Sequence, residues 1–215
     1  MGSRGASSKG TAGEHGAGML GKRRGGAGAT PQDAQYLSDQ IGKGGTQFAD
    51  EIMSTRDDLE SVYGESVKNL TLMTAKFSDS SIGGCYEVGA DTVYMNEKNI
   101  NNPALTETMK LAAKQGFHPS IGTFTGAEAV AAHEIGHGMA DFIEKTKGVT
   151  AMQIVAKAGK KIGVSTENVA GHISGYARYN YHETVAEACT DVYCNGNKAS
   201  KASKAIMAEV KNYLS

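Results

Sequence analysis

The stretch "HEIGHGMADF", residues 133–142, places two histidines four positions apart and a glutamate directly after the first. On an α-helix, side chains four positions apart project from one face, so His133 and His137 can direct two ring nitrogens at a single point. That arrangement suits zinc, which binds histidine nitrogen at about 2.0 to 2.1 Å. Glu134 lies about 100° further round the helix, where its carboxylate can take a proton from a metal-bound water. Two ligands do not hold a catalytic zinc ion, so a third must come from elsewhere.

The neighbouring residues predict that this stretch lies in the middle of a helix. Thr125 has the chemistry of an N-cap residue, and Glu128, three positions later, completes a capping box. Gly136 and Gly138 then fall inside the helix, where each costs about 1 kcal/mol relative to alanine. Their presence indicates that another element packs closely against this helix.

Candidates for the third ligand lie in "YHETVAEACTD", residues 181–191. Glu183, Glu187 and Asp191 recur every four positions and therefore share one helical face. Three acids on one face repel one another, and a cation or a basic partner opposite them would relieve that repulsion. The alternative is a solvated acidic stripe, but the small apolar residues between the acids are typical of a buried helix.

The composition predicts one globular domain and excludes several classes of partner. The chain has 215 residues, of which 40% are hydrophobic, and a formal net charge of −1. This balance of charge gives no general attraction to nucleic acid or to an anionic membrane. No apolar run approaches the ~20 residues of a membrane span, and the N-terminus lacks the apolar core of a signal peptide. We therefore expect a protein that is cytoplasmic where it is made. Its odd number of cysteines, without CxxC spacing, indicates structural or free thiols at Cys85, Cys189 and Cys194.

Local patterns divide the chain into three regions and predict an α+β fold. Residues 1–32 form a disordered, glycine-rich basic arm, because the first thirty residues hold ten of the 28 glycines and few large apolar side chains. Residues 33–66 form a helical lead-in, interrupted by glycines at 42–45, and residues 67–215 form the main domain. In that domain, short strands come first and helices follow. The expected strands are 69–77, 85–89 and 91–96, and the expected helices are 104–116, 126–148, 150–163, 181–196 and 200–214.

The strand expected at residues 91–96 allows two positions in the sheet. It can be an edge strand along the cleft, onto which an extended peptide adds as a further strand, or an ordinary internal strand. The residues favour neither position over the other.

The motif and its spacing resemble those of a known family. HExxH, followed some tens of residues later by a tyrosine seven positions before an ExxAE helix, is similar to the gluzincin-type metallopeptidases. These include the catalytic domain of anthrax lethal factor and zincin-like domains of phages and bacterial toxin systems. The matching stretches, "HEIGHGMADF" and "SGYARYNYHETVAEACTD", lie between residues 133 and 192. The resemblance implies a zincin-like fold, with Zn²⁺ held by His133, His137 and Glu183 and with Glu134 as the general base.

The resemblance also implies roles for residues around the metal. It makes Tyr176 the residue that stabilises the oxyanion, and it places Glu187 where a carboxylate accepts the other N–H of a ligating histidine. Asp141 matches a further acid one turn after the second histidine. Several alternatives stay open: Glu187 as the third ligand, Tyr179 or Tyr181 as the oxyanion partner, His182 as a competing ligand or substrate contact, and His118 and His172 as surface or hydrogen-bonded histidines.

Three functional hypotheses follow from these residues. The first is a zinc-dependent endopeptidase that hydrolyses peptide bonds of a peptide or protein substrate. The second is a catalytically weak or inactive zincin-like module, virion-associated or part of a toxin system, that contacts its phage or toxin-system partner through the N-terminal arm. The third is a helical interaction protein without a metal.

Overall fold

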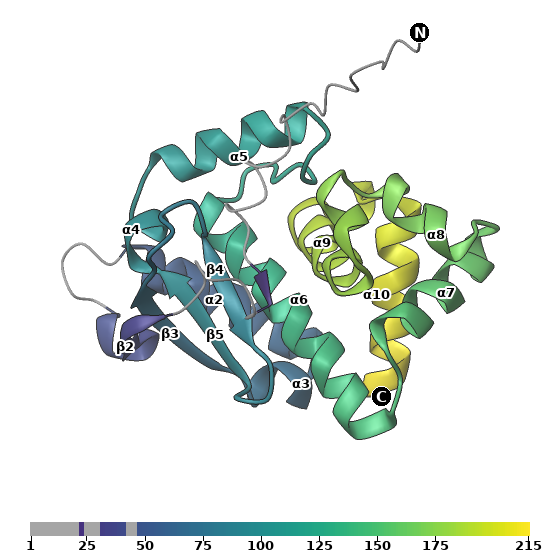
Figure 1. Ribbon diagram of the computed structural model, residues 1–215, viewed down its shortest axis with the longest axis horizontal. Helices are drawn as coiled ribbons and strands as arrows, with labels where there is room; N and C mark the ends of the chain where they lie inside the picture. The colour runs from purple at the N-terminus through teal and green to yellow at the C-terminus, as the bar shows by residue number, and fades with distance from the viewer. Residues whose placement is uncertain (1–21, 24–30, 42–46) are drawn as a thin grey trace, which may run out of the picture.

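Helix α6, Gly126–Lys147, runs through the middle of the molecule and carries residues 133–142 (Figure 1). The structure is a computed structural model that describes residues 22–23, 31–41 and 47–215. A mixed sheet lies on one side of α6, and helices from the C-terminal part of the chain lie on the other (Figure 1). The predicted α+β fold, with strands early and helices late, is confirmed.

The described residues form a five-stranded sheet in the order β1-β4-β5-β3-β2. Strands β1 and β4 are parallel, as are β3 and β5, whereas β4 and β5, and β2 and β3, are antiparallel. The three strands expected from the sequence are present. Because β5 is hydrogen-bonded to both β4 and β3, the strand expected at residues 91–96 is an internal strand and not an edge strand. The strands are β1 Lys22–Arg23, β2 Gln32–Tyr36, β3 Thr71–Lys76, β4 Gly84–Glu87 and β5 Thr92–Asn96.

The helices follow the expected order. Helix α2 packs against α6, while α9 lies against α6 on the other side and contacts α7 and α10. The helices are α2 Gln47–Tyr63, α3 Glu65–Lys68, α4 Glu97–Ile100, α5 Ala104–Lys114, α7 Ala151–Ile162, α8 Thr166–Val169, α9 Tyr181–Asn195 and α10 Lys201–Leu214. Short 3-10 helices are η1 Leu37–Gln40, η2 Ala170–His172, η3 Tyr176–Tyr179 and η4 Gly196–Lys198.

The N-terminal part of the chain differs from the prediction. The lead-in begins with strand β2, and its helix is α2, so the helical interpretation is wrong for residues 33–36. All five β2 side chains are exposed, so no apolar alternation marks this strand in the sequence. Its antiparallel pairing with β3 determines its conformation instead. The arm predicted at residues 1–32 lies largely outside the described residues. Of the part that is described, Lys22–Arg23 form β1 and Gln32 begins β2.

Helix α6 is buried because it lies between the two halves of the molecule. Its N-terminus has the predicted capping box: the Thr125 hydroxyl accepts the Glu128 N–H, and the Glu128 side chain accepts the Thr125 N–H. The helix ends at Gly148, whose φ of 66° is readily adopted only by glycine. Among the described residues, no helix is long and apolar enough to cross a membrane.

The two glycines inside α6 allow close packing on both of its sides. A Cβ added to Gly136 would lie 2.9 Å from the Ala186 Cα on α9. A Cβ added to Gly138 would lie 2.8 Å from a terminal methyl of Leu70, which precedes β3. The close contact expected from these glycines is therefore confirmed, and at Gly136 it brings α6 and α9 together at the level of the two motif histidines.

Candidate metal centre

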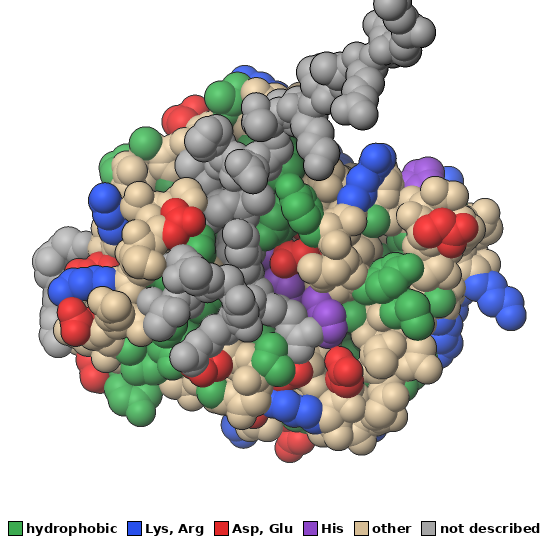
Figure 2. Space-filling view, viewed as in Figure 1, with side chains coloured by type: hydrophobic (Ala, Val, Ile, Leu, Met, Phe, Trp, Pro, Cys, Tyr) green, Lys and Arg blue, Asp and Glu red, His purple; other side chains and the backbone are tan. Residues whose placement is uncertain are grey.

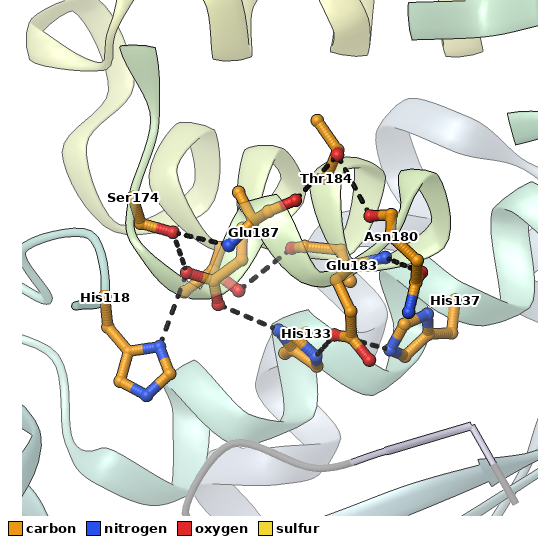
Figure 3. A network of polar contacts seen from close by, with 11 residues as sticks. His118, His133, His137, Ser174, Asn180, Glu183, Thr184 and Glu187 are labelled. Carbon is orange, nitrogen blue, oxygen red and sulfur yellow. Dashed lines mark hydrogen bonds and ion pairs between the residues drawn. The ribbon is translucent and has the colours of Figure 1, made fainter. Parts of the chain in front are cut away.

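Helices α6 and α9 bring three potential metal ligands together in the interior. His133 and His137 come from α6 and Glu183 from the first turn of α9, and all three are buried (Figure 3). One ligand atom from each lies within 4.8 Å of the other two. The Glu183 Oε2 is 3.0 Å from the His133 Nε2 and 3.4 Å from the His137 Nε2. Ligands around a tetrahedral zinc ion, at about 2 Å from the metal, lie roughly 3.3 Å apart, so the spacing fits such an ion.

Glu134 is buried next to these ligands without the partners that a buried carboxylate requires. Its side chain is 0% exposed, and no side chain of the described residues donates a hydrogen bond to its carboxylate, which lies near the Tyr86 backbone. Burial raises the pKa of Glu134 well above its ordinary value, although the nearby charge of His133 opposes this. Buried polar groups in proteins nearly always have a partner. A water molecule beside Glu134, or a cation bound by His133, His137 and Glu183, would supply such a partner.

Glu187 lies on the opposite side of His133 from Glu183. Its Oε1 is 3.1 Å from the His133 Nδ1, and its Oε2 accepts a 2.6 Å hydrogen bond from the Ser174 hydroxyl (Figure 3). The His118 Nδ1 is 3.4 Å from the same Oε2. A carboxylate at Nδ1 keeps the proton on that nitrogen and leaves Nε2 free to bind a metal. The sequence left both Glu183 and Glu187 as candidates for the third ligand. In the structure, Glu183 contacts the His133 Nε2 and Glu187 contacts the His133 Nδ1.

The carboxylates of α9 require a positive charge beside them. Burial would raise the pKa of Glu183, but His137 and His133 outweigh that effect and hold it below its usual range. Burial likewise opposes ionisation of Glu187, yet His118 and His133 lower its pKa to about 2. For His133, burial lowers the pKa, but hydrogen bonds to Glu183 and Glu187 raise it to about 10. A proton on His133, or a divalent cation on the same donors, satisfies these carboxylates.

Tyr176 is the tyrosine of its segment that reaches this centre. It is 2% exposed, and its ring centroid lies 5.7 Å from that of His133 and 5.1 Å from that of His118. Burial and the charge of Glu183 raise its pKa, so the hydroxyl stays protonated. Tyr179 is 57% exposed and touches the ring of Tyr176, and the half-buried Tyr181 begins α9.

Asp141 connects α6 to the sheet. Its Oδ2 accepts a 2.7 Å hydrogen bond from the Tyr86 hydroxyl and lies 2.9 Å from the Lys145 ammonium. Tyr86 belongs to β4, so this buried contact fixes the position of α6 along the sheet.

Other predicted residues lie away from the three ligands. The His182 Nε2 is 3.8 Å from a carboxylate oxygen of Glu144, and His172 is exposed. Asp191 caps the start of α10, where it accepts the Ser200 N–H and the Ser203 hydroxyl. The acids of α9 are therefore buried, and the solvated acidic stripe is wrong.

Two residues of the centre have no signal in the sequence that points to it. His118 was expected at the surface or in a hydrogen bond, and the structure shows the hydrogen bond, on Glu187. Ser174 was not expected at all. Both lie outside the long helices, in segments where no periodicity predicts which way a side chain points.

Figure 2 shows histidine side chains near the middle of the face in view, between the sheet and the C-terminal helices. Comparisons of the chain with protein-family models, with curated proteins and with solved structures gave no match. What the structure shows is a buried His-His-Glu group, consistent with an HExxH…E zincin-like site and compatible with metal binding.

Proposed function

We propose that this protein is a zinc-dependent endopeptidase in which His133, His137 and Glu183 hold the metal. The observation that supports this most is the position of Glu134, a buried carboxylate to which no side chain of the described residues donates a hydrogen bond, next to three converging metal-ligand atoms. Two histidines and one carboxylate form a ligand set that leaves a fourth position open on zinc, as catalytic rather than structural zinc sites do.

Zinc bound there would act as a Lewis acid that activates a water molecule and polarises the scissile carbonyl. Glu134 takes a proton from the attacking water as its oxygen bonds to the carbonyl carbon. It then delivers that proton to the amide nitrogen as the C–N bond breaks. Burial raises the pKa of Glu134, and a raised pKa makes its carboxylate a stronger acceptor for the proton of the water.

Tyr176 and Glu187 support the reaction from two sides. The protonated Tyr176 hydroxyl donates a hydrogen bond to the oxyanion that develops on the carbonyl oxygen. Glu187, itself fixed by Ser174, holds His133 in one tautomer and one orientation. Asp141 contributes by fixing α6 against β4.

The test compares zinc-loaded protein with a base-deficient variant on a diverse peptide library, with and without a chelator. Wild type should cleave peptides in a chelator-sensitive way. The Glu134→Gln variant should keep its zinc but lose activity by a factor on the order of 10² to 10⁴, as is typical when a general base is removed. Glu144→Gln, on the same helix, is the matched control and should keep both zinc and activity.

Two results would overturn the proposal. Cleavage retained by Glu134→Gln would exclude this mechanism. Zinc-loaded wild type that cleaves no peptide would instead favour a module whose metal serves stability or partner binding. Contact of the N-terminal arm with a partner from a phage or toxin system is a separate proposal.

A further inference from the structure

The edge of the sheet beside α6 is occupied by the chain itself. Strand β1 pairs with β4 in parallel, with Lys22 opposite Cys85 and Arg23 opposite Tyr86. It also contacts α6, in front of which it forms a short purple arrow in Figure 1. Without β1, strand β4 would be the exposed edge on this side of the five-stranded sheet formed by the described residues.

The part of β4 that pairs with β1 lies against the proposed general base. A Cβ added to Gly84 would lie 3.2 Å from the Glu134 Cγ, and the Tyr86 backbone lies near the Glu134 carboxylate. Residues 84–86 of β4 therefore flank Glu134, and β1 pairs with the last two of them. Neighbouring strands are about 4.8 Å apart, so β1 lies one strand away from the segment that contacts the general base.

We propose that Lys22–Arg23 competes with peptides for this edge. An extended peptide adds to a free sheet edge by main-chain hydrogen bonds, and β1 already uses those of β4. One part of this proposal rests on the proposed function, namely that the peptide excluded by β1 is a substrate. An activity of the metal centre would then be reduced as long as β1 occupies β4.

The length and the direction of β1 make it a displaceable occupant of this edge. The strand is two residues long, and parallel pairing is slightly less stable per residue than antiparallel pairing, so an incoming antiparallel peptide can replace it. Attachment to the same chain nevertheless favours β1 over a free peptide of equal length.

The experiment uses the full-length chain with Lys22→Pro and Arg23→Pro together. Proline has no backbone N–H and a fixed φ, so the two substitutions remove the β1 ladder. The matched control is Ser7→Pro with Ser8→Pro, a proline pair outside β1. The probe is a fluorescent decapeptide with the sequence of residues 18–27, and its binding is followed by anisotropy. The same peptide with prolines at the positions of Lys22 and Arg23 controls for non-specific binding.

We expect the probe to bind the Lys22→Pro/Arg23→Pro protein about tenfold more tightly than wild type or the control, the scale of one or two net backbone hydrogen bonds. Cleavage of library peptides should rise by a similar factor. Equal binding to all three proteins, or binding to none, would overturn the competition.

Binding and cleavage together separate the two proposals. The expected binding pattern without cleavage by any of the proteins supports the competition and contradicts the peptidase. Equal cleavage and equal binding support the peptidase and contradict the competition.

Discussion

Replacing Gly136 with alanine tests whether the approach of α6 to α9 assembles the metal centre. The added Cβ would lie 2.9 Å from the Ala186 Cα and 2.9 Å from the Cys189 Cβ. Carbon atoms in contact are ordinarily about 3.5 to 4.0 Å apart, so the helices must separate by roughly 0.6 to 1.1 Å. The Ala186 Cα and the Cys189 Cβ both belong to α9, and neither atom can move away by a side-chain rotation.

The expected change in the free energy of unfolding follows from two opposing effects. Overpacking costs up to about 3 kcal/mol, whereas replacing a helical glycine with alanine gains about 1 kcal/mol. Gly136→Ala should therefore destabilise the metal-free protein by roughly 2 kcal/mol. Gly138→Ala is the matched control, because the atoms nearest to its Cβ belong to the flexible side chain of Leu70, which can move. Its free energy of unfolding should stay within about 1 kcal/mol of wild type.

The same displacement should weaken metal binding. Metal–ligand distances tolerate deviations of about 0.2 Å, less than the separation that alanine requires at position 136. Metal affinity should fall at least about tenfold in Gly136→Ala and stay unchanged in Gly138→Ala. Urea unfolding in chelator gives the stabilities, and competition with a chromophoric chelator gives the affinities. Equal stability and equal metal affinity in the two variants would refute the packing account.

Three further variants test single contacts. Glu187→Gln should lower metal affinity by about 10- to 100-fold, because a ligating histidine loses its carboxylate partner, and an unchanged affinity in chelator competition would exclude that role. Tyr176→Phe should keep the metal and lower kcat by roughly 10² to 10³, and a kcat equal to that of wild type would rule out Tyr176 as an oxyanion donor. For Glu209, buried on α10, burial would raise the pKa, but ion pairs with Lys161 and Lys157 lower it from its ordinary value of 4.5. The resulting stability is present above pH 4.5 and lost as pH falls through the lowered pKa, so the destabilisation by Glu209→Gln should shrink in acid. Urea unfolding between neutral and acidic pH measures this, and a difference that does not change with pH would contradict it.

The helices were predictable because their signals are local. The capping box of Thr125 and Glu128 and the C-terminal Gly148 act within one turn, so they mark the ends of α6 without tertiary information. Strands β1 and β2 carry no such signal. Pairing with β4 and β3, which are distant in sequence, determines their conformation.

The candidate site was predictable up to the choice between two acids. The spacing of His133 and His137 follows from helix geometry alone, but Glu183 and Glu187 share one face of α9, so helix geometry does not choose between them and only the resemblance favours Glu183. Which of the two acids faces the metal-binding nitrogens depends on how α9 is placed along α6, and the contact of Ala186 with Gly136 determines that placement. His118 reaches Glu187 across 69 positions of sequence, a contact that no local pattern encodes.

Anomalous diffraction at the zinc edge, on crystals of the zinc-loaded protein, tests the metal centre most directly. We expect one peak in this centre, at about 2.0 to 2.2 Å from the His133 Nε2, the His137 Nε2 and a carboxylate oxygen of Glu183. The carboxylate of Glu187 should remain on the His133 Nδ1. A peak coordinated by Glu187 in place of Glu183, or no peak at these histidines after loading with zinc, would contradict this expectation.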